Sequence, residues 1–356
     1  MKLFECEGCG NAIYFENTTC EVCGRTLGFR SDRRALVALD LADDGRLKPL
    51  DDDSLFRSCA NREPGGCNWL VPAEAEGDYC TACCLNRTVP DLSNPEHQQL
   101  WRVLEGGKRR LVYSLLRFGL PVESKADRPE RGLAFDFLAD AVTGFREGPQ
   151  VMTGHAEGLI TINIAEADPA KREEFRQSMA EPYRTVLGHF RHEVGHYYWE
   201  RLVVRDPGNL ESCRALFGDE REDYGAALER HYEQGPPADW PARFVSAYAS
   251  SHPWEDWAET WAHYLHMVDS LETAYAFGLR VRPKAGASPD LSAAASFDPY
   301  READFARIKE TWLPMTFAVN SLNRSMGQAD LYPFVLSPPA EEKIAYVHDL
   351  IGRTRT

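Results

Sequence analysis

The stretch LGHFRHEVGHYYWERLV (187–203) contains side chains whose types and spacing could hold a metal ion. His192, Glu193 and His196 fit the pattern H-E-x-x-H. Histidines four residues apart lie side by side on a helix, so both imidazoles can bind one zinc ion. The glutamate after the first histidine lies close enough to remove a proton from a water molecule that the metal activates. The motif therefore predicts a zinc site with its own base.

A third histidine, His189, also lies one helical turn from His192. Only His192 and His196 enclose a glutamate at the next position, which favours this pair as the ligands. We expect His189 to contact the site from outside the ligand set or to pack beside it.

A third ligand is expected because a catalytic zinc keeps three protein ligands and one open position. The segment SAYASSHPWEDWAETWAHYLHMVDS (246–270) is the place to search for it. Pro253 begins a predicted helix there, and tryptophans recur along one side of it. Another side carries residues of ligand type: Glu255, Glu259, His263 and His266. Two helices that each separate a core side from a ligand side predict a zinc site between them, whereas a solvated acidic face would not explain the coincidence.

Cysteines form two further groups, and nine of the ten lie in the first 84 residues. The first group consists of two Cys-x2-Cys knuckles, each with a glycine after its second cysteine. Four thiolates at this spacing predict a zinc ribbon, and the metal would supply the folding energy that so small a domain lacks. The predicted ligands are Cys6, Cys9, Cys20 and Cys23.

The second cysteine group has one ordinary knuckle, Cys80-x2-Cys83, and a wider pair seven residues apart, Cys59 and Cys67. We predict a second four-thiolate zinc site from these residues. Cys84 is the spare thiol, and the sequence leaves open whether Cys83 or Cys84 is the ligand.

Helices and strands must position these groups. Leucine, valine and tryptophan at helical spacing predict a helix over 96–118, and Glu181-Pro182 begins another that carries the histidines. Alternating β-branched residues in 158–168 predict a strand. The stretch 282–300 is loop-like, and closing helices follow, the last with Ser337 as its N-cap.

The expected organisation is α+β. It consists of a zinc ribbon at 1–30, a second zinc module at 31–92, a linking helix at 93–123, a mixed α and β catalytic domain at 124–281, and a linker with C-terminal helices at 282–356.

Charge and hydropathy narrow the classes of function. A net charge of −15 disfavours general nucleic-acid binding, and the basic run Lys108-Arg109-Arg110 is interpreted as a solvated helix face. The chain has neither an apolar signal region nor a run near the ~20 residues of a membrane span. We therefore expect a cytoplasmic protein with reduced thiols and no membrane contact.

The two helices together resemble the gluzincin class of zinc metallopeptidases, in which a downstream glutamate joins the H-E-x-x-H histidines. The segment SAYASSHPWEDWAE is similar to the third-ligand segment of lethal-factor type peptidases. That resemblance implies Glu255 as the third zinc ligand, Glu259 as a carboxylate outside the ligand set, and Tyr248 as a donor to the oxyanion. His231, Tyr224 and Tyr232 are alternative donors.

A more specific resemblance covers most of the chain. The ribbon, CNWLV, PDLS, RHEVGHYYW and HPWEDWAETWAHYL resemble a bacterial family of zinc-binding metallopeptidases. This implies a zincin-like domain in which an edge strand binds extended substrate backbone. The residues in that position are Leu159, Ile160, Thr161 and Ile162, and an ordinary sheet strand is the alternative interpretation.

The leading hypothesis is hydrolysis of peptide or isopeptide bonds, with one catalytic and two structural zinc ions and Glu193 as general base. The expected partner is a protein or peptide substrate, and the ribbons could bind a further protein. The alternative is a non-enzymatic adaptor built on a degenerate zincin scaffold, and a nucleic-acid-binding ribbon ranks third. No specificity pocket can be identified from the sequence.

Overall fold

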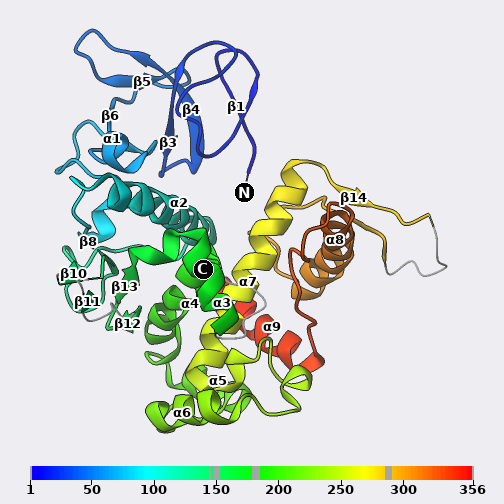
Figure 1. Ribbon diagram of the computed structural model, residues 1–356. Coiled ribbons are helices and arrows are strands. Elements are labelled where there is room, and N and C mark those ends of the chain that lie inside the picture. The colour runs from blue at the N-terminus through cyan, green and yellow to red at the C-terminus, as the bar shows by residue number, and fades with distance from the viewer. Residues whose placement is uncertain are drawn as a thin grey trace. The chain divides into compact units, whose positions relative to one another are not determined.

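The computed structural model describes residues 2–140, 142–143, 146–147, 153–178, 185–284 and 291–354. The chain divides into two compact units, Met1–Lys171 and Arg172–Thr356. Figure 1 shows the first unit in blue to green and the second in green to red. Within the described part of the chain, no helix combines the length and apolar character that a membrane crossing requires.

The first unit begins with small antiparallel sheets. Strand β1 pairs with β2, and five further strands form an antiparallel sheet in chain order. The bounds are β1 (Phe4–Glu5), β2 (Ala12–Ile13), β3 (Thr26–Arg30), β4 (Ala35–Leu41), β5 (Leu47–Pro49), β6 (Phe56–Ser58) and β7 (Leu70–Pro72), with helix α1 (Arg62–Gly65) before β7.

The five-stranded sheet curls so that its first and last strands approach each other. An isolated bridge joins Phe29 to Trp69, and the Phe29 amide donates to the Asn68 carbonyl at 2.8 Å. Gly28 makes this approach possible, because a Cβ there would lie 2.5 Å from the Leu70 side chain. The core of the sheet consists of Val37, Leu39, Leu47, Phe56 and Leu70.

The predicted helix over 96–118 is confirmed as α2 (Pro95–Phe118). Asn94 caps its first turn, with Pro95 as the first helical residue, and Gly119 ends it at φ +73°. The ring of Tyr113 on α2 packs against Phe15 and Phe29, with centroids 5.3 and 6.0 Å apart. The ribbon strands thus share an aromatic core with this helix.

One feature of α2 corrects the sequence interpretation. Lys108 is fully buried and Arg109 is 7% exposed, so the basic run is not a solvated face; only Arg110 has a largely exposed side chain, at 44%. Helical periodicity turns Lys108 toward the first unit's interior, where it has polar partners.

A second sheet in the first unit has the order β12-β13-β9-β8. Strands β8, β9 and β13 are parallel, and β12 pairs antiparallel with β13. The bounds are β8 (Asn86–Thr88), β9 (Ala134–Leu138), β12 (Gly154–Ala156) and β13 (Leu159–Asn163). Two short turns flank the sheet strands: η1 (Cys83–Leu85) precedes β8, and η2 (Ile164–Ala167) follows β13. A separate strand pair, β10 (Val142–Thr143) and β11 (Arg146–Glu147), precedes β12.

The predicted strand at 158–168 is confirmed in its first half, but its placement at a sheet edge is wrong. Residues Leu159–Thr161 pair with β12 on one side and with β9 on the other. The cause is a two-residue hairpin turn at Glu157 and Gly158, both with positive φ (48° and 81°). The backbone of Leu159, Ile160 and Thr161 is therefore already paired on both sides.

The second unit is mainly helical, as the sequence predicts for its C-terminal part. Helix α3 (Pro169–Ser178) crosses the boundary between the units. It is followed by α4 (Val186–Tyr198), the π-turn η3 (Trp199–Val203), α5 (Pro207–Phe217), α6 (Tyr224–Gln234), the 3-10 turns η4 (Trp240–Ala242) and η5 (Tyr248–Ser250), α7 (Pro253–Ala276), α8 (Phe305–Ser325) and α9 (Pro338–Arg353).

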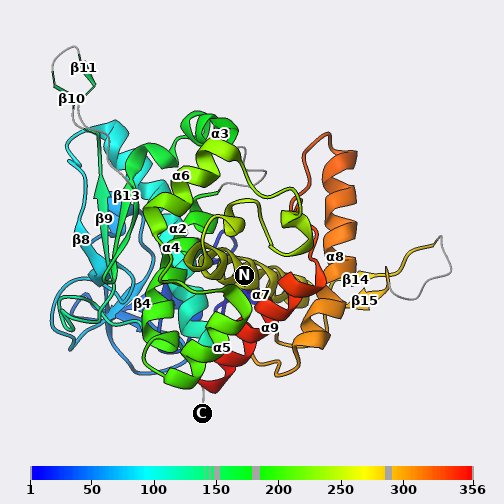
Figure 2. The same ribbon diagram turned by 90° about the horizontal axis from the view of Figure 1, so that it is seen from below.

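Helix α7 lies at the centre of this unit. It packs against α4, α8 and α9, as the two views show (Figures 1 and 2). It begins at Pro253 as predicted, with the His252 side chain accepting from the Trp254 amide. An ion pair of 2.5 Å between buried Asp256 and Lys343 fixes α9 to α7.

Other predicted boundaries have mixed outcomes. Ser337 caps α9 as predicted, with its side chain accepting from the Ala340 amide. Glu181 and Pro182 lie outside the described residues, and α4 begins at Val186 after the N-cap Thr185. The predicted loop 282–300 contains β15 (Ala293–Ala294), which pairs with β14 (Arg280–Val281).

Candidate metal centres

Helices α4 and α7 approach each other closely at a glycine of the H-E-x-x-H motif. A Cβ on Gly195 would lie 3.1 Å from the Ala258 Cα and 3.2 Å from the Trp261 ring. The Trp257 indole also donates to the Gly195 carbonyl at 2.8 Å. This close approach brings the face of α7 that carries Glu255 against the two histidines of α4.

Three potential ligands meet between these helices. The Nε2 atoms of His192 and His196 lie 2.9 and 3.7 Å from carboxylate oxygens of Glu255. All three residues are buried, with Glu255 only 1% exposed. Among the described residues, they form one of three groups whose donor atoms are close enough for a single metal ion.

The geometry at His192 fits a metal ion. Its Nδ1 lies 2.7 Å from Glu259 Oε1, and the tautomer that donates an Nδ1–H there leaves a lone pair on Nε2 for a metal ion. That lone pair faces Glu255 Oε2, which is buried and accepts no hydrogen bond. A metal ion bound by both Nε2 and this oxygen would satisfy the pair, as would a proton on Nε2. Burial lowers the pKa of His192, but Glu255 and Glu259 outweigh it and raise the pKa well above its ordinary value.

Glu259 occupies a different place from Glu255. One oxygen contacts His192 Nδ1, and the other accepts from the Ser246 hydroxyl at 2.7 Å. This arrangement orients the imidazole from outside the donor group. The more distant polar residues of α7 also have other partners, because His263 bonds to Tyr332 and His266 to Arg191.

The side chain of Glu193 is buried beside the donors and is not one of them. Its Oε1 lies 3.1 Å from Nε2 of His189, one turn earlier on α4. Burial would raise the pKa of Glu193, but His189 and the two nearby histidines hold it below the ordinary value. Glu193 is therefore an ionised carboxylate positioned by His189, as a general base must be.

Two phenols lie at the same centre. The ring of Tyr248 is 5.9 Å from the His192 ring, and the Tyr224 hydroxyl donates to Glu255 Oε1 at 2.7 Å. Burial and the charge of Glu255 raise the pKa of both tyrosines, so both keep their protons and can donate. The sequence offered Tyr224 only as one of several alternatives, since no spacing rule connects α6 to α7.

The remaining alternatives lie farther out. The His231 ring is 6.0 Å from the Tyr248 ring, and Tyr232 is 59% exposed. Sequence reasoning assigned Trp254 to the apolar stripe of α7, but its ring lies 4.0 Å from the His196 ring. This contact fixes the orientation of the second histidine.

The first four-thiolate group is assembled as predicted from Cys6, Cys9, Cys20 and Cys23. Sulfur atoms of Cys6 and Cys23, and of Cys9 and Cys20, lie 3.7 Å apart. Thiolates about 2.3 Å from a tetrahedral zinc lie roughly 3.8 Å from one another, so the spacing fits zinc. Cys9 is exposed, which places this group at the surface of the first unit.

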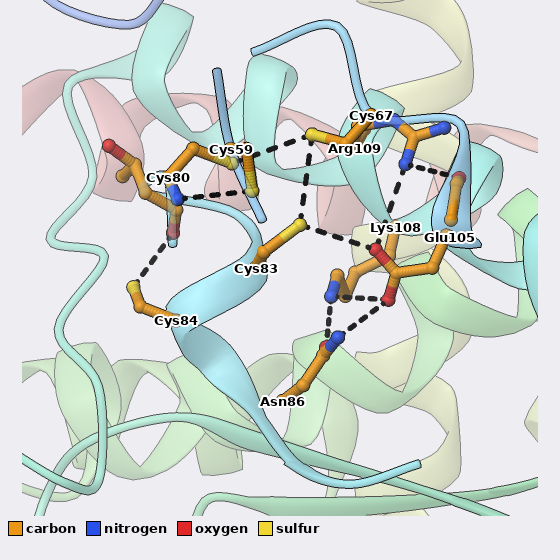
Figure 3. Close-up of polar contacts among 11 residues, drawn as sticks. Cys59, Cys67, Cys80, Cys83, Cys84, Asn86, Glu105, Lys108 and Arg109 are labelled. Atoms are coloured by element: carbon orange, nitrogen blue, oxygen red, sulfur yellow. Dashed lines mark hydrogen bonds and ion pairs between the residues drawn. The ribbon is translucent and has the colours of Figure 1, made fainter. Parts of the chain in front are cut away.

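The second four-thiolate group consists of Cys59, Cys67, Cys80 and Cys83, all of them buried. Cys67 Sγ lies 3.7 Å from the sulfur atoms of both Cys80 and Cys83, again a tetrahedral zinc spacing. Figure 3 shows Cys84 turned away from the other four, with its thiol near the Thr81 carbonyl at 3.3 Å. The geometry thus favours Cys83 over Cys84 as the fourth donor.

Comparisons with known proteins agree with these donor sets. A zinc-ribbon domain model matches residues 3–94, and the model of the family described as "Putative zinc-binding metallo-peptidase" matches residues 97–350. The chain is 41% identical over 351 residues to proteins of Mycobacterium bovis and of two strains of Mycobacterium tuberculosis, each named "Uncharacterized protein". These alignments cover 99% of this chain and 95% of each relative. No solved structure matches the chain.

Proposed function

The chain belongs to this family of zinc-binding metallopeptidases, and from that premise we propose that it hydrolyses peptide or isopeptide bonds. The site of reaction is the donor group His192, His196 and Glu255 between α4 and α7. One observation carries the proposal: three donors converge there, and the buried carboxylate of Glu193, which contacts His189, lies beside them. Three donors leave a position for a reactant, as in catalytic zinc sites.

The residues of the chain divide the work of the reaction. A zinc ion, when bound, supplies Lewis acidity that acidifies water and polarises a carbonyl. Glu193 takes the proton of the attacking water as the C–O bond forms, and returns it to the leaving nitrogen as the C–N bond breaks. His189 holds the carboxylate of Glu193 in place for both transfers.

Tyrosine hydroxyls support the negative charge that develops on the carbonyl oxygen. The ring of Tyr248 lies 5.9 Å from the His192 ring, and its hydroxyl keeps its proton, so it can donate a hydrogen bond to that oxygen. Tyr224 donates instead to Glu255, which makes it a positioning residue for the third donor. The two phenols therefore have separate tasks.

Incubating a proteome-derived peptide library with the zinc-loaded protein tests this function. New amino termini, labelled and identified by mass spectrometry, are expected with the wild type, and new lysine amines from added branched peptides would reveal isopeptidase activity. Glu193→Gln should retain its zinc and cleave at least ~10²-fold more slowly, because general base catalysis contributes about that factor. Equal cleavage by the variant would show that Glu193 is not the general base. Absence of cleavage by either protein would favour a non-enzymatic scaffold.

A further inference from the structure

A fully buried lysine lies next to the second four-thiolate group. Lys108 of α2 is 0% exposed, and its Nζ lies 2.7 Å from Glu105 Oε1 and also donates to the Asn86 side chain. The ammonium stands 5.8 and 5.5 Å from the ring centroids of Phe135 and Phe137 on β9. A buried ammonium is costly unless it is paired and hydrogen-bonded, so this position needs a reason.

The lysine's partners connect it to the cysteines. Glu105 Oε2 lies 3.6 Å from Cys83 Sγ, and its Oε1 accepts from Asn86 at 2.9 Å (Figure 3). Arg109 adds a second cation 3.7 Å from Glu105. Two buried cations and one carboxylate therefore stand beside the sulfur atoms, which leaves an excess of positive charge at that side of the group.

Four thiolates around one zinc ion carry a net negative charge. In the first group solvent can screen that charge, because Cys9 is exposed. The neighbouring Arg25, whose side chain is 37% exposed, adds a positive charge at the same surface. The second group has no such access, since its four cysteines are at most 2% exposed. A buried anion of this kind requires a cation within the protein.

We propose that Lys108 is the charge that stabilises zinc in the second four-thiolate centre, and that Asn86 transmits zinc occupancy to the sheet. Asn86 is the first residue of β8 and pairs with Phe135 of β9, three residues after Cys83. Zinc at this centre thus holds an outer strand of the β12-β13-β9-β8 sheet in register. This role concerns zinc retention and does not depend on peptidase activity.

Three variants of the full-length, zinc-loaded protein separate charge from packing. Lys108→Met removes the buried cation, and Glu105→Gln removes the carboxylate beside Cys83 with little change of shape. Arg110→Met is the matched control, because it removes a positive charge from the same helix where Arg110 makes a surface ion pair with Glu16. The measurement is zinc transfer to the chelator 4-(2-pyridylazo)resorcinol over time.

Lys108→Met should release one zinc per chain about 10-fold to 100-fold faster than the wild type, the usual effect of removing a group that supports metal ligands. Hydrogen exchange at Asn86–Thr88 should rise in parallel with that release. Glu105→Gln should release zinc no faster than the wild type, because the charge beside the thiolates becomes more positive. Arg110→Met should match the wild type in both measurements.

Wild-type release from Lys108→Met would overturn the proposal. So would equal acceleration in Glu105→Gln, because the network would then act through its hydrogen bonds and not through charge. If Lys108→Met does not fold, Glu105→Gln decides alone: faster release contradicts the proposal, and unchanged or slower release supports it. Unchanged exchange at β8 after zinc loss would exclude the transmission through Asn86.

Discussion

The second four-thiolate centre and the histidine–glutamate centre are both buried, yet their surroundings differ in kind. Four cysteines, each at most 2% exposed, stand beside the cation Lys108. Among the described residues, the other centre brings together three donors, with carboxylates and phenols beside them. Four thiolates complete the tetrahedral coordination of zinc, whereas three donors would leave one position open, next to Glu193 and the two phenols.

This difference teaches how one chain can combine a structural metal site with the catalytic site that we propose. A closed set of four donors fixes the metal and contributes folding energy. A set of three donors needs outside support, and here Glu259 and Tyr224 bond to the donors while Glu193 stays free of them. The number of donors and the charge of their neighbours distinguish the two centres better than burial does.

The largest effect is expected from breaking the closed centre. Cys80→Ser should lose one zinc per chain together with the fold of the first unit, because structural zinc contributes roughly 10–16 kcal/mol of apparent binding energy. Zinc analysis and thermal unfolding followed by circular dichroism check this. Cys84→Ser is the control and should leave both unchanged, since the Cys84 thiol points away from the group. Loss of zinc in the control would exchange the roles of Cys83 and Cys84.

The next effect concerns the three-donor centre. Glu255→Ala should lose one zinc per chain, whereas Glu259→Ala should keep it with an affinity about 10-fold to 100-fold weaker. Both variants should keep the fold, because the contact between α4 and α7 depends on Gly195, Ala258 and Trp261. Competition with a chelator measures the affinities. The reverse order of effects would make Glu259 the ligand.

Neither tyrosine variant should lose its zinc outright, and their effects should separate the roles of the two phenols. Tyr248→Phe should lower kcat by about 10²-fold to 10³-fold at unchanged zinc affinity, as loss of an oxyanion donor does. Tyr224→Phe should weaken zinc binding by about 1.5–3 kcal/mol, the worth of a hydrogen bond to a charged group, with kcat nearly kept once zinc is saturating. Turnover and chelator competition distinguish them. A fall of kcat in Tyr224→Phe alone would give the donor's role to Tyr224.

Local spacing explains which parts of the site the sequence could predict. His192, Glu193 and His196 lie on one helix, where the period of 3.6 residues fixes their directions. The separate sides of α7 left Glu255 and Glu259 both open as the third donor, and only the resemblance to lethal-factor type peptidases favoured Glu255. The cysteine knuckles are equally local, and a metal needs all four thiolates at one place.

The errors arose where tertiary contacts or turn chemistry decide. Lys108 has the pattern of a solvated helix face, and its polar contacts with Glu105 and Asn86 compensate for its burial. Tyr224 reaches Glu255 from α6, which no spacing in the sequence reveals. The edge position expected for Leu159 failed because Glu157-Gly158 closes a hairpin, a turn signal that could have been recognised.

Anomalous diffraction at the zinc edge, from crystals grown with zinc, tests most directly the claim that one centre is closed and the other open. We predict a peak inside each cysteine group and a third between the Nε2 atoms of His192 and His196 and the carboxylate of Glu255, with three protein ligands. Peaks in the cysteine groups alone, or a fourth protein ligand at the third peak, would contradict it.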